Sequence, residues 1–469
     1  MTAVTSTRAV LEPMLVAMST VVTNPYLAGN FAPVTDERDD ADLPITGAIP
    51  PRLGGLLVRN GPNPIAPDPA SYHWFLGDGM LHAIELRGGR ARYRNRWVRT
   101  DAAARALGEE PVPDQPAECN DLDAVSNTHV VAHAGRILAL VESSLPNEMG
   151  TDLSTGGRFD FDGRLRSPMT AHPKVDPVTG ELHFFGYDVF GPPWLRYHVA
   201  DASGALVRTE PIDIAGPSMV HDFQITERHV VWLDLPVVFD FDLVGERPFP
   251  ARWMPEYGAR VGVMPRDGGN ADVRWFEVEP CYVFHPLNGY DDGDTVVVDV
   301  VRHETMFRDD RYGPADRPPR LDRWSIDLVA GKVREETLDD RPQELPRVDE
   351  RRVGRPHRYG YAPRVGIEES SSPEFRSLLK HDLHRGVTDT HEVGAGRAAG
   401  EAVFVPASPD AGEDEGWVLA VVYDATRDTS DVVVIDASDF TGSPVATVHL
   451  PRRVPHGFHG SWVAGASLG

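Results

Sequence analysis

The chain has 469 residues, of which 46 are basic and 71 acidic, giving a net charge of −25. Nucleic acid is not an expected partner, because phosphate contacts need clustered Lys and Arg side chains. The chain has only two cysteines, Cys119 and Cys281, so it carries neither a disulfide framework nor a cysteine-based metal site, and we expect a reducing, cytoplasmic location.

The first patterned segment is residues 1–22, which we expect to form an N-terminal arm. Leu11, Leu15, Met18 and Val22 follow helical spacing, and the segment is too short to span a bilayer. It also lacks the basic region and cleavage site of a secretory signal. Two interpretations stay open: an arm packed on the body of the protein, or a peripheral membrane contact that would suit a lipid-soluble substrate.

After this arm, β-branched apolar runs alternate with acidic or Gly-rich turns, which predicts many short strands. The clearest runs are Gly135–Glu142, Gly180–Tyr187, Val230–Leu235, Thr295–Val301, Trp417–Tyr423 and Asp431–Asp436. Short helices are expected at Ala102–Leu107 and Phe375–Leu379, and Arg308–Arg320 is expected to be a long surface excursion.

This many strands without alternating helices argues against a parallel α/β sheet, and a single barrel or sandwich would be too small. A β-propeller accommodates such a number of strands by radial repetition. Since no domain boundary is visible, we expect one domain over residues 1–469.

Four histidines lie in unusual apolar or backbone-shaping patches at expected strand ends. The patches are Ala171–Lys174 (AHPK), Met219–Phe223 (MVHDF), Tyr282–Pro286 (YVFHP) and Gly457–Trp462 (GFHGSW). The histidines are His172, His221, His285 and His459, at intervals of 49, 64 and 174 residues, which fit one, one and three propeller blades. Neutral imidazoles are the usual ligands of iron, copper and zinc.

A single histidine at a strand end is more often a hydrogen-bonded structural residue than a ligand. That interpretation suits five histidines in ordinary surroundings: His183, His198, His229, His303 and His449. Glu142, Glu344 and Glu401 lie in apolar settings and are candidates to orient ligand imidazoles, or they are exposed strand-end residues. The sequence holds no HExxH zinc motif, no Walker A motif and no GxGxxG after a strand.

Four longer motifs extend the pattern over nearly the whole chain. They are Asn24–Phe31 (NPYLAGNF), Arg59–Pro64 (RNGPNP), His73–His82 (HWFLGDGMLH) and Leu450–Gly460 (LPRRVPHGFHG). With these motifs in this order, the chain resembles the carotenoid cleavage oxygenases, iron(II) dioxygenases that split carotenoids, apocarotenoids and stilbenes. The resemblance implies an all-β fold: a seven-bladed β-propeller with a cap of helices and loops on one face and iron on its axis.

The same resemblance implies roles for individual residues. The four non-haem iron ligands would be His172, His221, His285 and His459, holding one Fe(II) per chain, with O2 as co-substrate. The three glutamates Glu142, Glu344 and Glu401 would lie behind these ligands, which leaves His172 to a different partner or to water. Thr128 matches a residue that crowds one open iron position.

The resemblance also implies an apolar small-molecule substrate cleaved at a C=C bond to carbonyl products. In the stilbene-cleaving branch a Lys that engages the substrate's phenol precedes the first of these glutamates; in this chain Val141 takes its place, which favours a carotenoid or apocarotenoid. Met219 and Phe284 either line the substrate tunnel or belong to the core.

Three alternatives remain open. The nearest is the same chemistry on a stilbene or phenylpropanoid such as lignostilbene, resveratrol or isoeugenol. A non-oxidative propeller hydrolase using calcium or zinc would need carboxylate and amide ligands for a hard cation, against which the four histidines argue. A non-catalytic propeller that binds partners on its faces would not need inward histidines.

Overall fold

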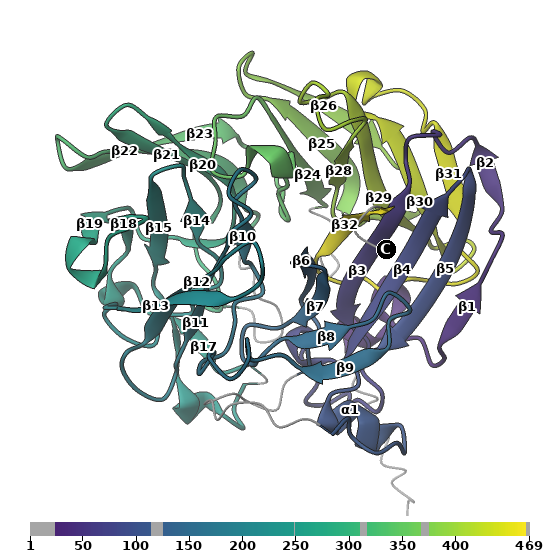
Figure 1. Ribbon diagram of the computed structural model, residues 1–469, viewed down its shortest axis with the longest axis horizontal. Helices are drawn as coiled ribbons and strands as arrows, with labels where there is room; N and C mark the ends of the chain where they lie inside the picture. The colour runs from purple at the N-terminus through teal and green to yellow at the C-terminus, as the bar shows by residue number, and fades with distance from the viewer. Residues whose placement is uncertain (1–23, 114–124, 248, 310–316, 367–374, 466–469) are drawn as a thin grey trace, which may run out of the picture.

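Blades of antiparallel sheet surround a central axis in the computed structural model, which describes residues 24–113, 125–247, 249–309, 317–366 and 375–465 (Figure 1). The expected N-terminal arm (1–22) and Cys119 lie outside these residues. The architecture is the predicted all-β seven-bladed propeller, and the described residues contain a single α-helix, α1 (Asp101–Ala106).

Each blade runs from an inner strand near the axis to an outer strand at the rim. In this order, blade 1 is β32 (Gly460–Ala464), β3 (Gly55–Pro62), β4 (Gly79–Arg87), β5 (Arg90–Trp97) and β1 (Arg38–Asp40). Blade 2 is β6 (His129–His133), β7 (Arg136–Leu140), β8 (Asn147–Met149) and β9 (Thr155–Arg158). Blade 3 is β10 (Lys174–Val175), β11 (Leu182–Tyr187), β12 (Leu195–Ala200) and β13 (Leu206–Ile212). Blade 4 is β14 (Gln224–Ile225), β15 (His229–Asp234), β18 (Arg260–Pro265) and β19 (Arg274–Glu277).

Blade 5 is β20 (Tyr282–Asp292), β21 (Thr295–His303), β22 (Arg320–Asp327) and β23 (Lys332–Asp339). Blade 6 is β24 (Tyr359–Val365), β25 (Phe375–Asp382) and β26 (Val387–Glu392). Blade 7 has β27 (Arg397–Ala399) and β28 (Val403–Pro406) along β29 (Gly416–Asp424), followed by β30 (Thr429–Asp436), β31 (Ala446–His449) and β2 (Ile45–Gly47). A small sheet of β16 (Val237–Phe239) and β17 (Ala251–Trp253) lies in the connection between β15 and β18.

The ring is closed by strands from both halves of the chain. The late strand β32 pairs with β3 inside blade 1, where Leu57 is opposite Trp462. The early strand β2 pairs with β31 at the outer edge of blade 7, where Ile45 is opposite Val448. Sheets that exchange strands in this way cannot separate without breaking backbone hydrogen bonds on both sides of the junction.

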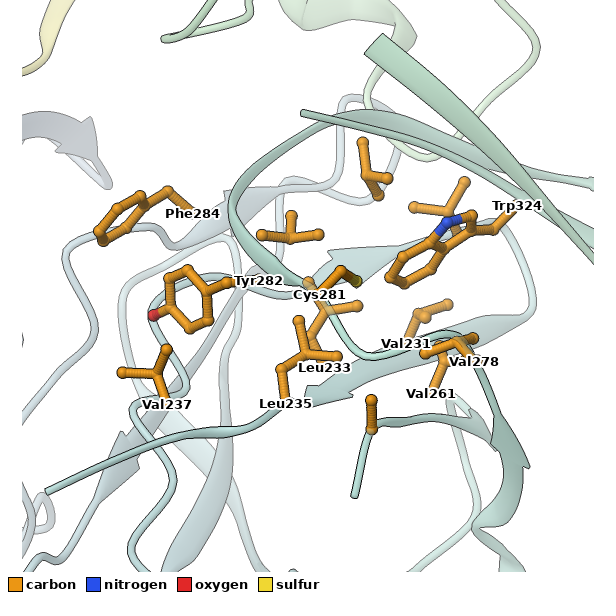
Figure 2. Packing of buried hydrophobic residues seen from close by; sticks show 14 of the residues in the cluster. Val231, Leu233, Leu235, Val237, Val261, Val278, Cys281, Tyr282, Phe284 and Trp324 are labelled. Carbon is orange, nitrogen blue, oxygen red and sulfur yellow. The ribbon is translucent and has the colours of Figure 1, made fainter. Parts of the chain in front are cut away.

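The core lies between neighbouring blades rather than at the axis. Figure 2 shows the junction of blades 4 and 5, where Val231 and Val261 face Trp324, all fully buried. Middle strands are covered on both faces, so β21 and β30 are continuous β-branched runs instead of alternating ones. Each fully buried aliphatic side chain contributes about 1.5–3 kcal/mol to this packing.

The predicted elements are confirmed with one exception. All six predicted strand runs contain strands (β7, β11, β15, β21, β29 and β30), and the helix predicted at 102–107 is α1. The helix predicted at Phe375–Leu379 is wrong, because these residues begin β25, the middle strand of blade 6. Leu378 and Leu379 are both fully buried there, and a short apolar run buried on both faces has no strand periodicity. The described ends of the predicted excursion, 308–309 and 317–318, are exposed.

Candidate metal centre

Four histidines that are far apart in the sequence meet at the axis. His172 and His221 lie just before the inner strands β10 and β14, His285 lies within β20, and His459 directly precedes β32. The ring centroid of His172 is 4.5 Å from that of His221, 5.0 Å from that of His285 and 4.7 Å from that of His459. We refer to these four residues as the four-histidine cluster.

The donor atoms of three of these histidines lie close enough together to hold a single metal ion, and the fourth histidine adjoins them. One ring nitrogen from each of His172, His285 and His459 lies within 4.8 Å of the others, and Nε2 of His221 is 2.9 Å from Nε2 of His172. Nε2 of His285 is buried without a hydrogen-bond partner. Burial, together with the neighbouring imidazoles, holds the pKa of His172 and of His459 far below the ordinary histidine value, so both rings are neutral and offer lone pairs.

Three of the four imidazoles are oriented by glutamate carboxylates, which we call the outer carboxylates. His221 Nδ1 is 2.6 Å from Oε2 of Glu142, and His285 Nδ1 is 2.7 Å from Oε2 of Glu344. His459 Nδ1 is 2.8 Å from Oε1 of Glu401. An imidazole that donates its Nδ1–H to a carboxylate leaves Nε2 unprotonated and more basic, which is how metal-binding histidines are usually held.

The outer carboxylates are themselves held by further donors. Glu344 accepts from His303 Nε2 at 2.9 Å and from the Leu345 backbone N–H. Although burial raises the pKa of Glu344, its two imidazole neighbours outweigh burial and hold that pKa well below the usual range. Glu401 accepts from Arg347 at 3.0 Å and from the Gly460 N–H at 2.8 Å. Glu344 therefore stays ionised although it is buried.

His172 differs from the other three. The carboxylate nearest to its Nδ1 belongs to Asp222, whose Oδ2 lies 3.9 Å away, beyond hydrogen-bonding distance. Asp222 is instead paired with Lys174. The cluster thus contains three imidazoles with an anionic acceptor and one without.

Each of the seven blades contributes one side chain to this centre. Blades 1, 3, 4 and 5 provide histidines, and blades 2 and 7 provide Glu142 after β7 and Glu401 before β28. Glu344 belongs to blade 6, because the segment 343–347 pairs with β24 through the bridges Gln343–Arg364 and Arg347–Tyr361. The wide sequence interval between His285 and His459 therefore contains blades 6 and 7, which supply two of the three glutamates.

The remaining predicted site residues surround the cluster. The Thr128 carbonyl accepts from the His459 N–H at 3.1 Å, and Val141 directly precedes Glu142. The Phe284 ring is 4.9 Å from the ring of His221. Met219 packs with Phe284 in the core between blades 4 and 5.

Phe284 begins a continuous series of aromatic rings that leads away from the cluster, which we call the aromatic row. It continues to Phe75 at 6.2 Å, from there to Phe249 at 5.4 Å, and then to Phe307 at 5.5 Å. Phe75 belongs to a short 3-10 helix, Trp74–Leu76, in which Leu76 is half exposed. The row therefore extends away from the cluster through apolar side chains, and the residue that follows Phe75 in the chain is exposed.

One histidine near the centre was missed by sequence reasoning. The His129 ring is 5.2 Å from that of His459 and 6.1 Å from that of His172, and its Nδ1 donates to the Ala171 carbonyl at 2.8 Å. Burial lowers the pKa of His129 to about 3. Its proximity to Thr128 in the sequence was the only available signal. The histidines expected to be structural are hydrogen-bonded away from the axis, except His303, which holds Glu344.

The surface shows a small apolar patch. Phe190 and Phe241 are 61% and 40% exposed, and their rings stack at 5.4 Å. Val244 in the same loop region is also exposed. Within the described part of the chain, no helix is both long and apolar enough to cross a bilayer.

Comparison with known proteins gives consistent matches over the whole length. The family model described as retinal pigment epithelial membrane protein matches residues 31–464. A carotenoid cleavage oxygenase from Mycobacterium tuberculosis is 43% identical over 96% of this chain and 99% of its own. An isoeugenol monooxygenase from Pseudomonas nitroreducens is 32% identical over 94% of this chain and 98% of its own. The crystal structure of a Pseudomonas brassicacearum lignostilbene dioxygenase superposes with a TM-score of 0.85 at 31% identity, covering 94% of this chain and 98% of that one.

Proposed function

The chain belongs to the carotenoid cleavage oxygenase family, and we propose that it acts on a carotenoid or apocarotenoid with one iron(II) per chain. As a member of this family it is a dioxygenase that cleaves a C=C double bond oxidatively to carbonyl products. The proposed ligands are the four-histidine cluster, His172, His221, His285 and His459. The observation that carries this proposal is the convergence of four imidazoles, three of them oriented by buried carboxylates.

The residues of the centre suit a divalent cation. Iron(II), when bound, supplies the redox-active ion that activates O2, and imidazole is a suitable ligand for it. Four neutral imidazoles leave the charge of such an ion uncompensated, and Glu142, Glu344 and Glu401 offset it from behind the ligands. They also hold the rings of His221, His285 and His459 through Nδ1, so that Nε2 of each is left for the ion. No side chain has to act as a nucleophile or as a general acid.

The substrate is bound by apolar contact. We propose that Phe284 and the rest of the aromatic row align a polyene beside the cluster, with Met219 behind Phe284. Thr128, whose carbonyl binds the His459 backbone, would restrict access to one side of the ion and leave a single position for O2. Holding the double bond and O2 in contact supplies the proximity that the reaction needs.

A stilbene or phenylpropanoid is the second candidate substrate. Two of the relatives carry names that refer to isoeugenol and lignostilbene, at 32% and 31% identity. Val141, which stands beside Glu142 and is buried, provides no charged group for a phenol. This residue favours the polyene.

Incubation of the Fe(II)-loaded protein with a full-length carotenoid, an apocarotenal, resveratrol and isoeugenol, with products identified by mass, tests the substrate. We expect carbonyl products from the polyenes, and products from the two phenols alone would contradict the proposal. His285→Ala should lose both iron and activity, because it removes an imidazole and leaves Glu344 without its partner. A His285→Ala protein that retains iron and cleaves normally would refute the ligand assignment.

We further propose that the protein is cytoplasmic and touches membranes through the patch of Phe190, Phe241 and Val244, from which a lipid-soluble substrate is taken up. Replacing Phe190 and Phe241 together by Ser should reduce co-sedimentation with phosphatidylcholine vesicles. The control is Val329→Ser, which removes an even more exposed apolar side chain on blade 5. If both variants lose the same amount of vesicle co-sedimentation, or if neither loses any, the patch is not the membrane contact.

A further inference from the structure

The four imidazoles of the cluster are not equivalent, and the difference has a cause outside the cluster. His221, His285 and His459 each donate to a glutamate at 2.6–2.8 Å. The corresponding carboxylate for His172 is that of Asp222, whose Oδ2 lies 3.9 Å from His172 Nδ1. A movement of about 1 Å would complete the same arrangement on all four histidines.

Asp222 is held back by an ammonium group. Lys174 Nζ is 2.8 Å from Oδ1 and 3.0 Å from Oδ2 of Asp222, so it binds both oxygens. The Phe223 backbone N–H donates to Oδ1 at 2.6 Å. Asp222 is 2% exposed, and its charge is compensated inside the protein by Lys174 rather than by water.

The ion pair joins the two blades that carry adjacent histidines. Lys174 lies in β10 of blade 3, two residues after His172, and Asp222 lies in blade 4, directly after His221. Its members are therefore fixed to the same backbone segments as two of the proposed ligands. A change in this pair acts on His172 without replacing any ligand.

The charges of the centre explain why such a pair is useful. Three outer carboxylates and a divalent ion sum to one negative charge, which Arg347 at Glu401 offsets. A fourth ionised carboxylate would leave this buried region negatively charged, which is unfavourable at low dielectric. The ammonium group of Lys174 offsets the negative charge that Asp222 adds to this region.

We propose that the Lys174–Asp222 ion pair is a positioning element that withholds the Asp222 carboxylate from His172 and so leaves His172 as the one imidazole of the cluster without a carboxylate acceptor. This inference rests on the proposed metal site. Without the pair, Asp222 would be buried and uncompensated, and the His172 Nδ1–H is the donor within its reach. The resulting fourth carboxylate–imidazole contact would strengthen metal binding.

The test uses Co(II) as a spectroscopic probe, with competition against a chelator and visible absorption of the bound ion. We expect Lys174→Met to lower the Co(II) dissociation constant about tenfold and to shift the absorption bands, because an added carboxylate contact has an effect on that scale. Lys174→Arg retains the cation and should match the wild type in both readouts. Glu142→Gln, which weakens an existing contact, should change affinity in the opposite direction.

Two further variants separate this role from a structural one. Lys380→Met removes a different lysine, which lies in blade 6, is buried and is paired with Asp414, and should leave the absorption bands unchanged. The double variant Lys174→Met/Asp222→Asn removes both charges and should bind Co(II) within about twofold of the wild type. A tenfold loss in the double variant would mean that Asp222 already supports His172, and would overturn the inference even if Lys174→Met alone did not fold.

The possible outcomes distinguish a failure of the proposed ion-pair role from a failure of the proposed metal site. If the wild type binds no Co(II), or if His285→Ala binds it as well as the wild type, the proposed metal site is wrong. If those two proteins behave as expected and Lys174→Met has wild-type affinity and bands, the metal site stands and the role of the ion pair is refuted.

Discussion

A histidine serves as a metal ligand only if it is neutral and if the correct ring nitrogen faces the ion. Burial provides the first condition for His172 and His459, whose pKa values lie far below the ordinary value. The carboxylate behind the ring provides the second, as Glu401 does for His459. The same buried setting that suits the metal would be costly for an isolated carboxylate, which explains why Glu344 and Glu401 each have a second donor.

Buried neutral histidines away from the centre make the fold sensitive to acid. Burial lowers the pKa of His198 to about 3, below the value of about 6.5 in an unfolded chain. As pH falls below 6.5 the unfolded state binds the proton first, so stability that is complete above this pH is progressively lost, by about 2 kcal/mol at pH 5 for this one group. His198→Gln should show a correspondingly smaller loss of unfolding free energy between pH 7.5 and 5, measured with urea.

Exposed His384 provides the control for this experiment. His384→Gln should lose as much stability over the same pH interval as the wild type. If His198→Gln and the wild type respond identically to pH, the neutral state of His198 in the folded protein is not the origin of the acid sensitivity.

At the level of single residues, the sequence predicted which groups would meet but not how they are supported. The four histidines and three glutamates follow from local motifs that carry the family resemblance. Lys174 and Asp222 stand next to predicted ligands, but their pairing joins positions 48 residues apart in different blades, and no local pattern encodes it. The same holds for the contact of Arg347 with Glu401.

The inner strands fix, at their ends, the positions of the proposed ligands. β10, β14 and β32 each begin one to three residues after a histidine, so the strand start sets where the imidazole lies. The segment before β32 is packed tightly: a Cβ on Gly457 would lie 2.7 Å from the Asn60 carbonyl oxygen and 2.9 Å from the Gly61 Cα. A side chain there must displace the backbone that carries His459.

Gly457→Ala should therefore weaken metal binding at least tenfold and lower the thermal midpoint, because the displaced segment also contains backbone contacts to Asn60. Metal affinity by chelator competition and thermal unfolding are the measurements. Gly191→Ala, at a position with open space around the added methyl group, should change neither. Wild-type metal affinity in Gly457→Ala would show that the segment adjusts without moving His459.

The sequence predicted strands well where turn residues bound an apolar run, as for β21 and β30. It failed at Phe375–Leu379, where consecutive buried leucines reflect coverage of both faces by neighbouring blades rather than a helical face. The pairing of β32 with β3 was also beyond local pattern, since it joins strands from opposite ends of the chain. Tertiary contacts decide both cases.

For the molecule as a whole, the centre couples all blades to one another. A metal ion that binds only the folded ring stabilises it by about 2.7 kcal/mol when its concentration is 100 times the dissociation constant. Removing the metal with a chelator should lower the thermal midpoint by a few degrees, as measured by calorimetry. His285→Ala should show no such difference with and without metal, and an equal shift in that variant would place the stabilising ion elsewhere.

Propellers with four to eight blades exist. In the present chain each of the seven blades supplies one of the seven side chains around the axis. Loss of any blade would delete a proposed ligand or a supporting carboxylate, and an additional blade would widen the ring and separate the imidazoles. On the proposed ligand assignment, the number of blades is therefore fixed by the seven side chains around the axis.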